Sequence, residues 1–321
     1  MLRKISFITL LLLLLASADS YAKVFKVALI KTKSAFSYDE TLKGYKRYVK
    51  KAKKYLDNRL IRLKIVEYDY KVESKNNKKF IKNIKNKKYD VVVTLGRRAF
   101  ESVRDEITNT PIIFATMLNP YDGDMQPDDE HPNIAGIEMD IPISVQFEAF
   151  RSFVPYLQNI GVIYSDTPEN SKLINDAKKV ADDLDLSLIA YKVQDERQVF
   201  SALDEVVKNS DALWMIPDYN IYSKEVLKHT IMFTIENELP FMGLSKAYVK
   251  AGALFTVTRD YKDIGRQAAI MSYDVIKNGV PRDSRVQPLR KYPLIINGRT
   301  AESIDLRIPQ WVSENTIKVY E

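Results

Sequence analysis

The sequence of 321 residues contains no cysteine and only two histidines, His131 and His229. Without cysteine the chain can form no disulfide, no thiolate metal site and no thiol nucleophile, and it offers no cysteine for a lipid anchor. Neither histidine has the spacing of a metal site, since one lies in a loop rich in Pro and Asp and the other falls inside a predicted helix. We therefore expect no metal, and a surface or packing role for both histidines.

Glycine is also scarce, with ten residues that stand singly at predicted turns. The Walker A, G-x-G-x-x-G, G-x-S-x-G and H-E-x-x-H patterns are all missing from the sequence. No loop can therefore be assigned to cradle a phosphate, and no pair of base and nucleophile can be recognised. We predict that the protein has no cofactor and is not an enzyme.

Long apolar runs are absent except at the N-terminus. Arg3 and Lys4 precede an apolar core, and Ser20-Tyr21-Ala22 has the small residues of a secretory cleavage site. The 12-residue core, Ile5 to Ala16, is too short to span a hydrocarbon layer of about 30 Å, which disfavours a membrane anchor. We predict that residues 1–22 are a cleaved signal peptide and that the mature protein is exported without a lipid anchor, most simply to the periplasm.

The composition, with 45% apolar and 28% charged residues, is typical of a soluble globular protein, but its charge is unevenly distributed. From Lys43 to Lys88 there are 18 Lys or Arg and 4 Asp or Glu, a net charge of +14, whereas the whole chain carries +7. Such a segment is either a face that binds anions or nucleic acid, or a solvated pair of helices. Export disfavours nucleic acid, and we favour solvated helices.

Short apolar strands alternate with helices of 10–20 residues, which predicts an α/β fold with doubly wound parallel sheets. The first half has predicted strands Val24–Ile30, Arg59–Tyr68, Asp90–Leu95 and Pro111–Ala115, with helices Tyr38–Asp57, Glu73–Asn86 and Arg97–Asp105 between them. After Asn133–Met139 the pattern restarts. The second half has helices Pro142–Phe153, Ser165–Leu184, Glu196–Asn209 and Tyr222–Asn237, and strands Ile160–Tyr164, Leu186–Val193, Asp211–Pro217, Phe241–Ser245 and Ala253–Thr258.

A polar junction, Arg259–Asp263, separates the strand Ala253–Thr258 from a predicted helix at Ile264–Lys277. It is typical of a chain that leaves one lobe and begins a helix on another. We expect further crossings near Glu138–Ile141 and Gln287–Tyr292. The predicted division is residues 23–139 with 258–287 in lobe 1, and residues 140–257 with 288–321 in lobe 2, joined by a hinge.

Ligands of open α/β sheets bind at the carboxyl ends of the strands. In the first half, the polar or turn residues at these ends are Thr32, Ser34, Thr94, Gly96, Arg97, Thr116 and Asn119. At the junction, the residues Arg259, Asp260 and Tyr261 either contact the ligand or only form the hinge between the lobes. We favour the hinge role.

Several segments in a specific order carry a resemblance to a known family. They are DVVVTLGRRA (Asp90–Ala99), TPIIFA with NP (Thr110–Pro120), NIAGI (Asn133–Ile137), IGVIYSDTPENS (Ile160–Ser171), DALWMIPD (Asp211–Asp218), YVKAGALF (Tyr248–Phe255), DIGRQAA (Asp263–Ala269) and LIINGRTAESI (Leu294–Ile304). From about Val24 to Val312 the chain resembles the ABC transporter substrate-binding proteins related to tryptophan- and tyrosine-binding proteins. The resemblance implies the type I periplasmic binding protein fold and an amino-acid-like ligand in a cleft between two Rossmann-like lobes.

The resemblance also implies which residues line that cleft. In lobe 1 they are Thr94 with nearby amides, Thr116 and Asn119. In lobe 2 they are Tyr164, Ser165, Glu169, Asn170, Ser171, the loop after Pro217 with Asp218 and Tyr219, and Ser245.

One position departs from the family pattern. Amino-acid-binding members commonly carry Asp-Asn after this strand, where the Asp neutralises the ligand's ammonium group. Here the run is Pro217-Asp218-Tyr219-Asn220. If Asn220 aligns with the family Asn, Tyr219 stands in place of the Asp, and it either stacks on a ligand ring or fills the cleft.

We therefore expect a monomeric periplasmic protein that captures a small molecule for an ABC permease in the inner membrane. The alternative is a ligand-sensing subunit that works with a membrane sensor kinase or cyclase. Neither function involves nucleic acid.

Overall fold

The computed structural model describes residues 23–32, 35–55, 61–71, 77–117, 130–310, 312 and 316–320. The chain divides into two compact units. Unit 1 comprises the described residues up to Asp140 together with Tyr261–Arg290, and unit 2 comprises Ile141–Asp260 together with the described residues from Lys291 onward. Within the described residues, no helix has the length and apolarity that a bilayer crossing requires.

Unit 1 is built on a six-stranded parallel sheet with the order β11-β5-β4-β3-β1-β2. The strands are β1 (Lys23–Lys31), β2 (Ile61–Asp69), β3 (Val91–Leu95), β4 (Ile112–Met117), β5 (Ile134–Glu138) and β11 (Val286–Gln287). The helices are α2 (Phe36–Tyr55), α3 (Asn77–Asn86), α4 (Arg97–Arg104) and α10 (Tyr261–Asn278). Every residue of β3 and β4 is buried, as their unbroken apolar character requires in a sheet covered on both faces.

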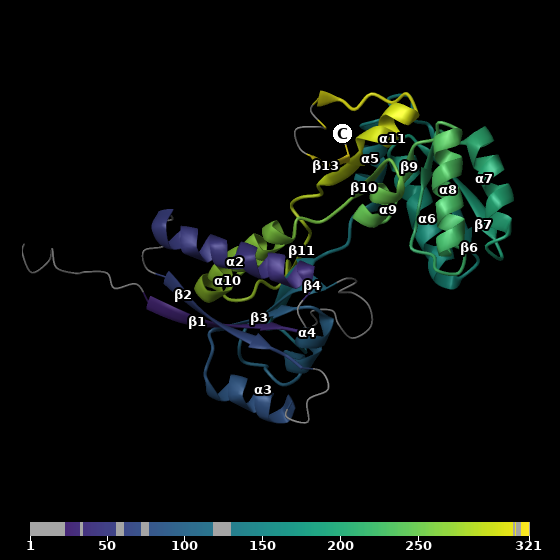
Figure 1. The fold of residues 1–321 in the computed structure, drawn as a ribbon. Coiled ribbons are helices and arrows are strands. Elements are labelled where there is room, and N and C mark those ends of the chain that lie inside the picture. Colours follow the sequence, from purple (N-terminus) through teal and green to yellow (C-terminus); the bar gives the residue numbers. More distant parts are fainter. Residues whose placement is uncertain are drawn as a thin grey trace, which may run out of the picture. The chain divides into compact units, whose positions relative to one another are not determined.

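Helices cover both faces of this sheet (Figure 1). α3 and α4 lie on one face, where Ile84 and Phe100 pack with Ala28, Val92 and Phe114 of the strands. α2 and α10 lie together on the other face (Figure 1). The strands therefore place alternate side chains into two separate apolar layers.

The close approach of α2 and α10 depends on two glycines. A Cβ at Gly44 would collide with the carbonyl of Lys262, and one at Gly265 would collide with the carbonyl of Thr41. Beside this contact the buried Tyr45 hydroxyl donates to Ser272 Oγ at 2.8 Å. Burial raises the pKa of Tyr45, because a phenolate would lose its hydration there.

Unit 2 contains a seven-stranded sheet with the order β13-β12-β10-β9-β8-β6-β7. All neighbours are parallel except β10 and β12, which are antiparallel. The strands are β6 (Asn159–Ser165), β7 (Ser187–Val193), β8 (Ala212–Trp214), β9 (Phe241–Met242), β10 (Phe255–Val257), β12 (Leu294–Asn297) and β13 (Thr316–Tyr320). The helices are α5 (Ile143–Arg151), α6 (Pro168–Asp183), α7 (Gln198–Asn209), α8 (Lys224–Glu236), α9 (Lys246–Ala251) and α11 (Gly298–Ser303).

The predicted doubly wound α/β fold is confirmed, with corrections at particular elements. The strands predicted at Asp211–Pro217 and Phe241–Ser245 are shorter, because β8 ends at Trp214 and β9 at Met242. The polar junction predicted at Arg259–Asp263 is wrong for its last three residues, since α10 begins at Tyr261 rather than at Ile264. Asp263 stands in the first turn of α10, where an acidic side chain favours helix initiation.

Candidate functional site

The carboxyl ends of β6 and β8 meet in a buried polar network in unit 2. Asp218 is 4% exposed, and its carboxylate accepts hydrogen bonds from the backbone N–H of Ser165 at 2.6 Å and from the Ser165 hydroxyl at 3.0 Å. It also accepts from Asn170 Nδ2 at 2.8 Å and from the backbone N–H of Asn220 at 3.1 Å. No cation forms an ion pair with Asp218 among the described residues, so four neutral donors hold a buried negative charge.

The local sequence explains how Asn170 reaches this network. β6 ends at Ser165, and the Thr167 side chain then caps α6 by accepting from the backbone N–H of Asn170 at 3.1 Å. Pro168 follows the cap in the first helical turn, which suits its fixed φ. Asn170 can thus donate back to the Ser165 carbonyl at 3.1 Å and to Asp218.

A second aspartate joins the same two strands at their amino ends. Asp211 precedes β8, and its carboxylate accepts from the backbone N–H groups of Gln158 at 2.9 Å and Asn159 at 2.8 Å, at the start of β6. Asp211 and Asp218 therefore tie the two ends of the β6–β8 pair in a similar way. Only Asp218 lies at the end of the sheet where ligands of this fold class bind.

Aromatic side chains adjoin the network. Tyr219 is 90% exposed, whereas Asp218 before it is buried. The side chain of Asp218, and not that of Tyr219, therefore points into unit 2. The hydroxyl of Tyr222 is buried and has no hydrogen-bond partner in the described part of the chain. Burial, and then the negative charge of Asp218, raise the pKa of Tyr222. Asn220 completes the group by donating from Nδ2 to Ser165 Oγ at 3.2 Å.

The other predicted site residues of unit 2 are spread around this edge. Tyr164 is half-buried and packs against the unit 2 core. Glu169 is exposed and Ser171 half-buried in the first turn of α6. Ser245 caps α9 by accepting from the backbone N–H of Ala247 at 3.3 Å, and Asp260 is the last residue before the chain enters unit 1.

In unit 1, three predicted residues have unusual surroundings at the ends of β3 and β4. Thr94 is fully buried, and its hydroxyl has no hydrogen-bond partner within the described residues. Gly96 has φ +91°, and a Cβ there would collide with the Tyr38 hydroxyl. Thr116 has φ +56° where the β4–β5 register shifts, which is a strained conformation for a β-branched residue. Backbone strain of this kind, about 1–3 kcal/mol, is concentrated at functional sites.

The remaining predicted positions of unit 1 divide into two groups. Thr32 is buried directly after β1, and Arg97 begins α4, whose N-cap Gly96 provides no side-chain cap. Ser34 and Asn119 lie outside the residues that the structure describes.

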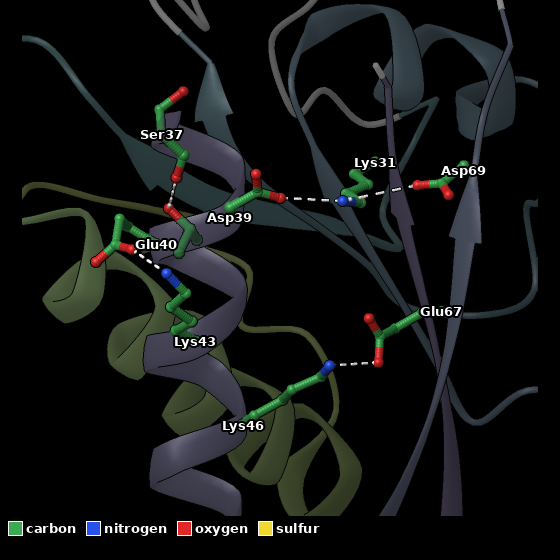
Figure 2. Close-up of polar contacts among 9 residues, drawn as sticks. Lys31, Ser37, Asp39, Glu40, Lys43, Lys46, Glu67 and Asp69 are labelled. Carbon is green, nitrogen blue, oxygen red and sulfur yellow. Dashed lines mark hydrogen bonds and ion pairs between the residues drawn. The ribbon is translucent and has the colours of Figure 1, made fainter. Parts of the chain in front are cut away.

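Two residues near the end of β1 were not predicted from the sequence. Phe36, the first residue of α2, is 76% exposed, and its ring meets Tyr261 edge-on at a centroid distance of 6.2 Å. Lys31 lies at the end of β1 between Asp39 at 3.0 Å and Asp69 at 3.7 Å (Figure 2). The hydrogen bond to Asp39 raises the pKa of Lys31 despite partial burial. A bulky apolar residue inside the polar run KTKSAFSYDE was the available signal for Phe36.

Both histidines make contacts within their own unit. His131 Nε2 lies 3.1 Å from Asp105 Oδ1, and His229 meets Phe200 edge-on with ring centroids 4.6 Å apart. Across the residues that the structure describes, no group of three or more His, Asp or Glu side chains is arranged to hold a metal ion.

A family model described as ABC transporter substrate binding protein matches residues 26–320. The chain belongs to this family. Among known proteins, it is 24% identical over 286 residues to a tyrosine-binding protein of Clostridioides difficile, covering 88% of this chain and 80% of that protein.

Solved structures share the fold. A ligand-free, open substrate-binding protein with adhesive properties from Clostridium difficile has 17% identity and a TM-score of 0.72, covering 92% of this chain and 99% of that one. A Streptococcus pneumoniae ABC domain in complex with L-Trp has 21% identity and a TM-score of 0.53, covering 92% of this chain and 100% of that one. The resemblance stated from the sequence motifs is thus confirmed, and the family consists in general of solute-binding proteins rather than enzymes.

Proposed function

We propose that this family member captures a small amino-acid-like solute outside the cytoplasm, in the periplasm, and delivers it to an ABC importer. The family supports a small-molecule ligand and a transporter partner. The names of the relatives, one for tyrosine and one with bound L-Trp, support an aromatic amino acid. Export through the segment at residues 1–22 belongs to the same proposal.

The observation that carries the ligand class is the buried carboxylate of Asp218. Four neutral donors satisfy its oxygens, and within the described residues no cation neutralises it. A negative charge held in this way attracts a cationic group brought by a ligand. We therefore propose that Asp218 acts on the ammonium group of the solute even though it stands one residue before the position expected from the family pattern.

Each unit, taken by itself, offers further candidate ligand contacts at its own strand ends. In unit 2, Tyr219 would offer an exposed ring and Asn170 would hold Asp218 in place. In unit 1, the N-terminus of α4 behind Gly96 offers backbone N–H groups to a carboxylate, and Phe36 offers an apolar surface.

Calorimetric titration of residues 23–321 tests the ligand class. We expect L-tyrosine or L-tryptophan to bind, and 3-phenylpropionate, which has no ammonium group, to bind far more weakly. If the aromatic amino acids give no heat and no rise in melting temperature, the proposed ligand class is wrong.

A pair of matched variants tests the role of Asp218. Asp218→Asn removes the charge, and the loss of a hydrogen bond to a charged group, about 1.5–3 kcal/mol, should weaken amino-acid binding about tenfold to a hundredfold. Asp211→Asn makes the same change at the opposite ends of β6 and β8 and should leave the affinity nearly unchanged. Denaturant unfolding of both variants shows whether lost stability, rather than lost charge, explains a change in affinity. Equal affinities of the two variants would show that Asp218 only joins the strands.

A further inference from the structure

The outer surface of α3 carries a dense group of lysines that solute binding does not explain. We define the α3 lysine face as Lys78, Lys79, Lys82, Lys85, Lys87 and Lys88, all of which are exposed. α3 itself contains no acidic residue. Lys78, Lys82 and Lys85 follow one another at spacings of four and three residues, so they project from the same side of the helix.

The inner side of α3 is fully used in packing. Ile81 and Ile84 are buried in the unit 1 core, and Phe80 packs against Tyr68 with ring centroids 5.7 Å apart. The helix lies on the face of the sheet away from α2 and α10 (Figure 1). Lys78, Lys79, Lys82 and Lys85 therefore lie on the outer side of the helix. The surface that they share with Asn83 and Asn86 is mainly polar, with the partly buried Phe80 at its edge.

Few of these lysines have a partner. Lys85 forms an ion pair with Glu106 at 2.6 Å, and Lys87 donates to the Tyr68 hydroxyl at 3.1 Å. Lys78, Lys79 and Lys82 form no ion pair among the described residues. A groove of about 510 Å³ between α3 and the end of α4 is lined by Lys78, Lys82, Lys85 and Glu106, among others.

We propose that the α3 lysine face binds the surface of a bilayer that contains anionic phospholipids. A diffuse set of exposed ammonium groups suits a surface whose phosphates are numerous and mobile, because no fixed pattern of contacts is needed. The face lacks the exposed aromatic side chains on which nucleic-acid bases would stack, and the apolar side chains that would insert into the acyl region. Since the family works with membrane transporters, contact of this kind would keep the protein near its transporter.

Flotation of residues 23–321 with lipid vesicles tests this proposal. We expect binding to vesicles of phosphatidylcholine with one third phosphatidylglycerol at low salt, and no binding to phosphatidylcholine alone. Because the lysines are exposed, their attraction is screened over about 10 Å at 0.1 M salt, so binding should fall steeply as salt rises. Absence of binding to the anionic vesicles at low salt would overturn the proposal.

Two triple variants that lower the net charge by the same amount distinguish an effect of the α3 lysine face from an effect of net charge alone. Each lysine near an anionic surface contributes about fivefold to binding, so Lys78→Gln, Lys79→Gln and Lys82→Gln together should weaken it about a hundredfold. Lys172→Gln, Lys178→Gln and Lys179→Gln on α6 change the net charge equally, at exposed helical positions of unit 2. This control should bind nearly as the wild type does. Equal losses in the two variants would overturn the assignment to α3.

A third variant should change binding in the opposite direction. Glu106→Gln frees Lys85 and removes a negative charge from the groove, so it should strengthen vesicle binding severalfold. Weaker or unchanged binding would contradict the role of this groove. Solute binding by the lysine variants, measured by calorimetry, should be unchanged, which keeps this test separate from that of the proposed function.

Discussion

At the scale of single residues, unit 2 offers two exposed tyrosines at opposite ends of its sheet. Tyr219 follows β8 and is 90% exposed, and Tyr156 precedes β6 and is 76% exposed. We predict that Tyr219→Ala weakens the binding of an aromatic solute about threefold to tenfold, because stacking of two rings contributes about 0.5–1.5 kcal/mol. Calorimetric titration measures the change.

Tyr156→Ala is the matched control, since it removes the same side chain from the amino end of the sheet. Neither variant should lower the melting temperature appreciably, because both rings are exposed. An affinity of Tyr219→Ala equal to that of the control would show that Tyr219 does not contact the solute.

Glu138, at the end of β5, provides a prediction of pH dependence. Burial, and then the charge of Asp140, raise its pKa above the ordinary value of 4.5. A carboxyl whose pKa is higher in the folded than in the unfolded protein favours folding when it is protonated. Its contribution to the stability of the fold is therefore lost as the pH rises through the folded-state pKa. Glu138→Gln should therefore raise the melting temperature by about 1–2 °C near pH 7.

The same variant should have no such effect below about pH 4, where the carboxyl is protonated in both states. Glu101→Gln makes the same substitution at an exposed position of α4 and should change the melting temperature little at either pH. A gain for Glu138→Gln that is equal at both pH values would contradict the electrostatic explanation.

At the scale of elements, the α2–α10 pair depends on the absence of side chains at Gly44 and Gly265. Gly265→Ala would force a methyl group against the Thr41 carbonyl, and backbone cannot move aside as a flexible side chain can. We predict a loss of about 2–3 kcal/mol or more in the free energy of unfolding, at the upper end of overpacking costs. Urea denaturation measures the loss.

Gly279→Ala serves as the control for this prediction. Its added Cβ meets no atom within 4 Å, but its φ of +78° makes a side chain unfavourable. The expected loss in the free energy of unfolding is only that of placing a side chain at a positive φ, about 1 kcal/mol. If both variants lose the same stability, close helix packing is not the reason for glycine at residue 265.

At the scale of the whole molecule, the chain passes between the two units three times, after Asp140, Asp260 and Arg290. Unit 2 therefore needs its last segment, because β12 pairs with β10 and β13 pairs with β12. The chain ends that leave and re-enter unit 2 are close together, since the Thr258 N–H donates to the Pro293 carbonyl at 2.8 Å.

We predict that residues 141–321 fold alone when residues 261–290 are replaced by a Gly/Ser linker of about six residues, which reaches about 13 Å on average. This chain should unfold in one cooperative transition in urea. Residues 141–260 alone should not, because β10 would lose its antiparallel neighbour. Cooperative unfolding of the shorter chain would show that β12 and β13 are dispensable.

Sequence patterns predicted the buried strands well where apolar runs were continuous, as at Val91–Leu95 and Ile112–Met117. They overestimated β8 and β9, and in β8 the apolar character continues past the last hydrogen bond to β9, as at Ile216. Burial alone makes such residues apolar, whether or not they belong to a strand. They also did not predict the antiparallel partner β12, because pairing over about 40 residues leaves no local signal.

The sequence by itself determined the α/β class, the order of the elements and the family, because strand and helix periodicity and short motifs are local properties of the chain. Only the tertiary structure decided that Asp218 rather than Tyr219 turns into unit 2, that Asp211 repeats its role at the other ends of the strands, and that Thr116 is strained. The two aspartate contacts join residues more than 50 positions apart in the sequence, and the strain at Thr116 accompanies a register shift between β4 and β5. They arise from long-range packing, which sequence periodicity does not encode.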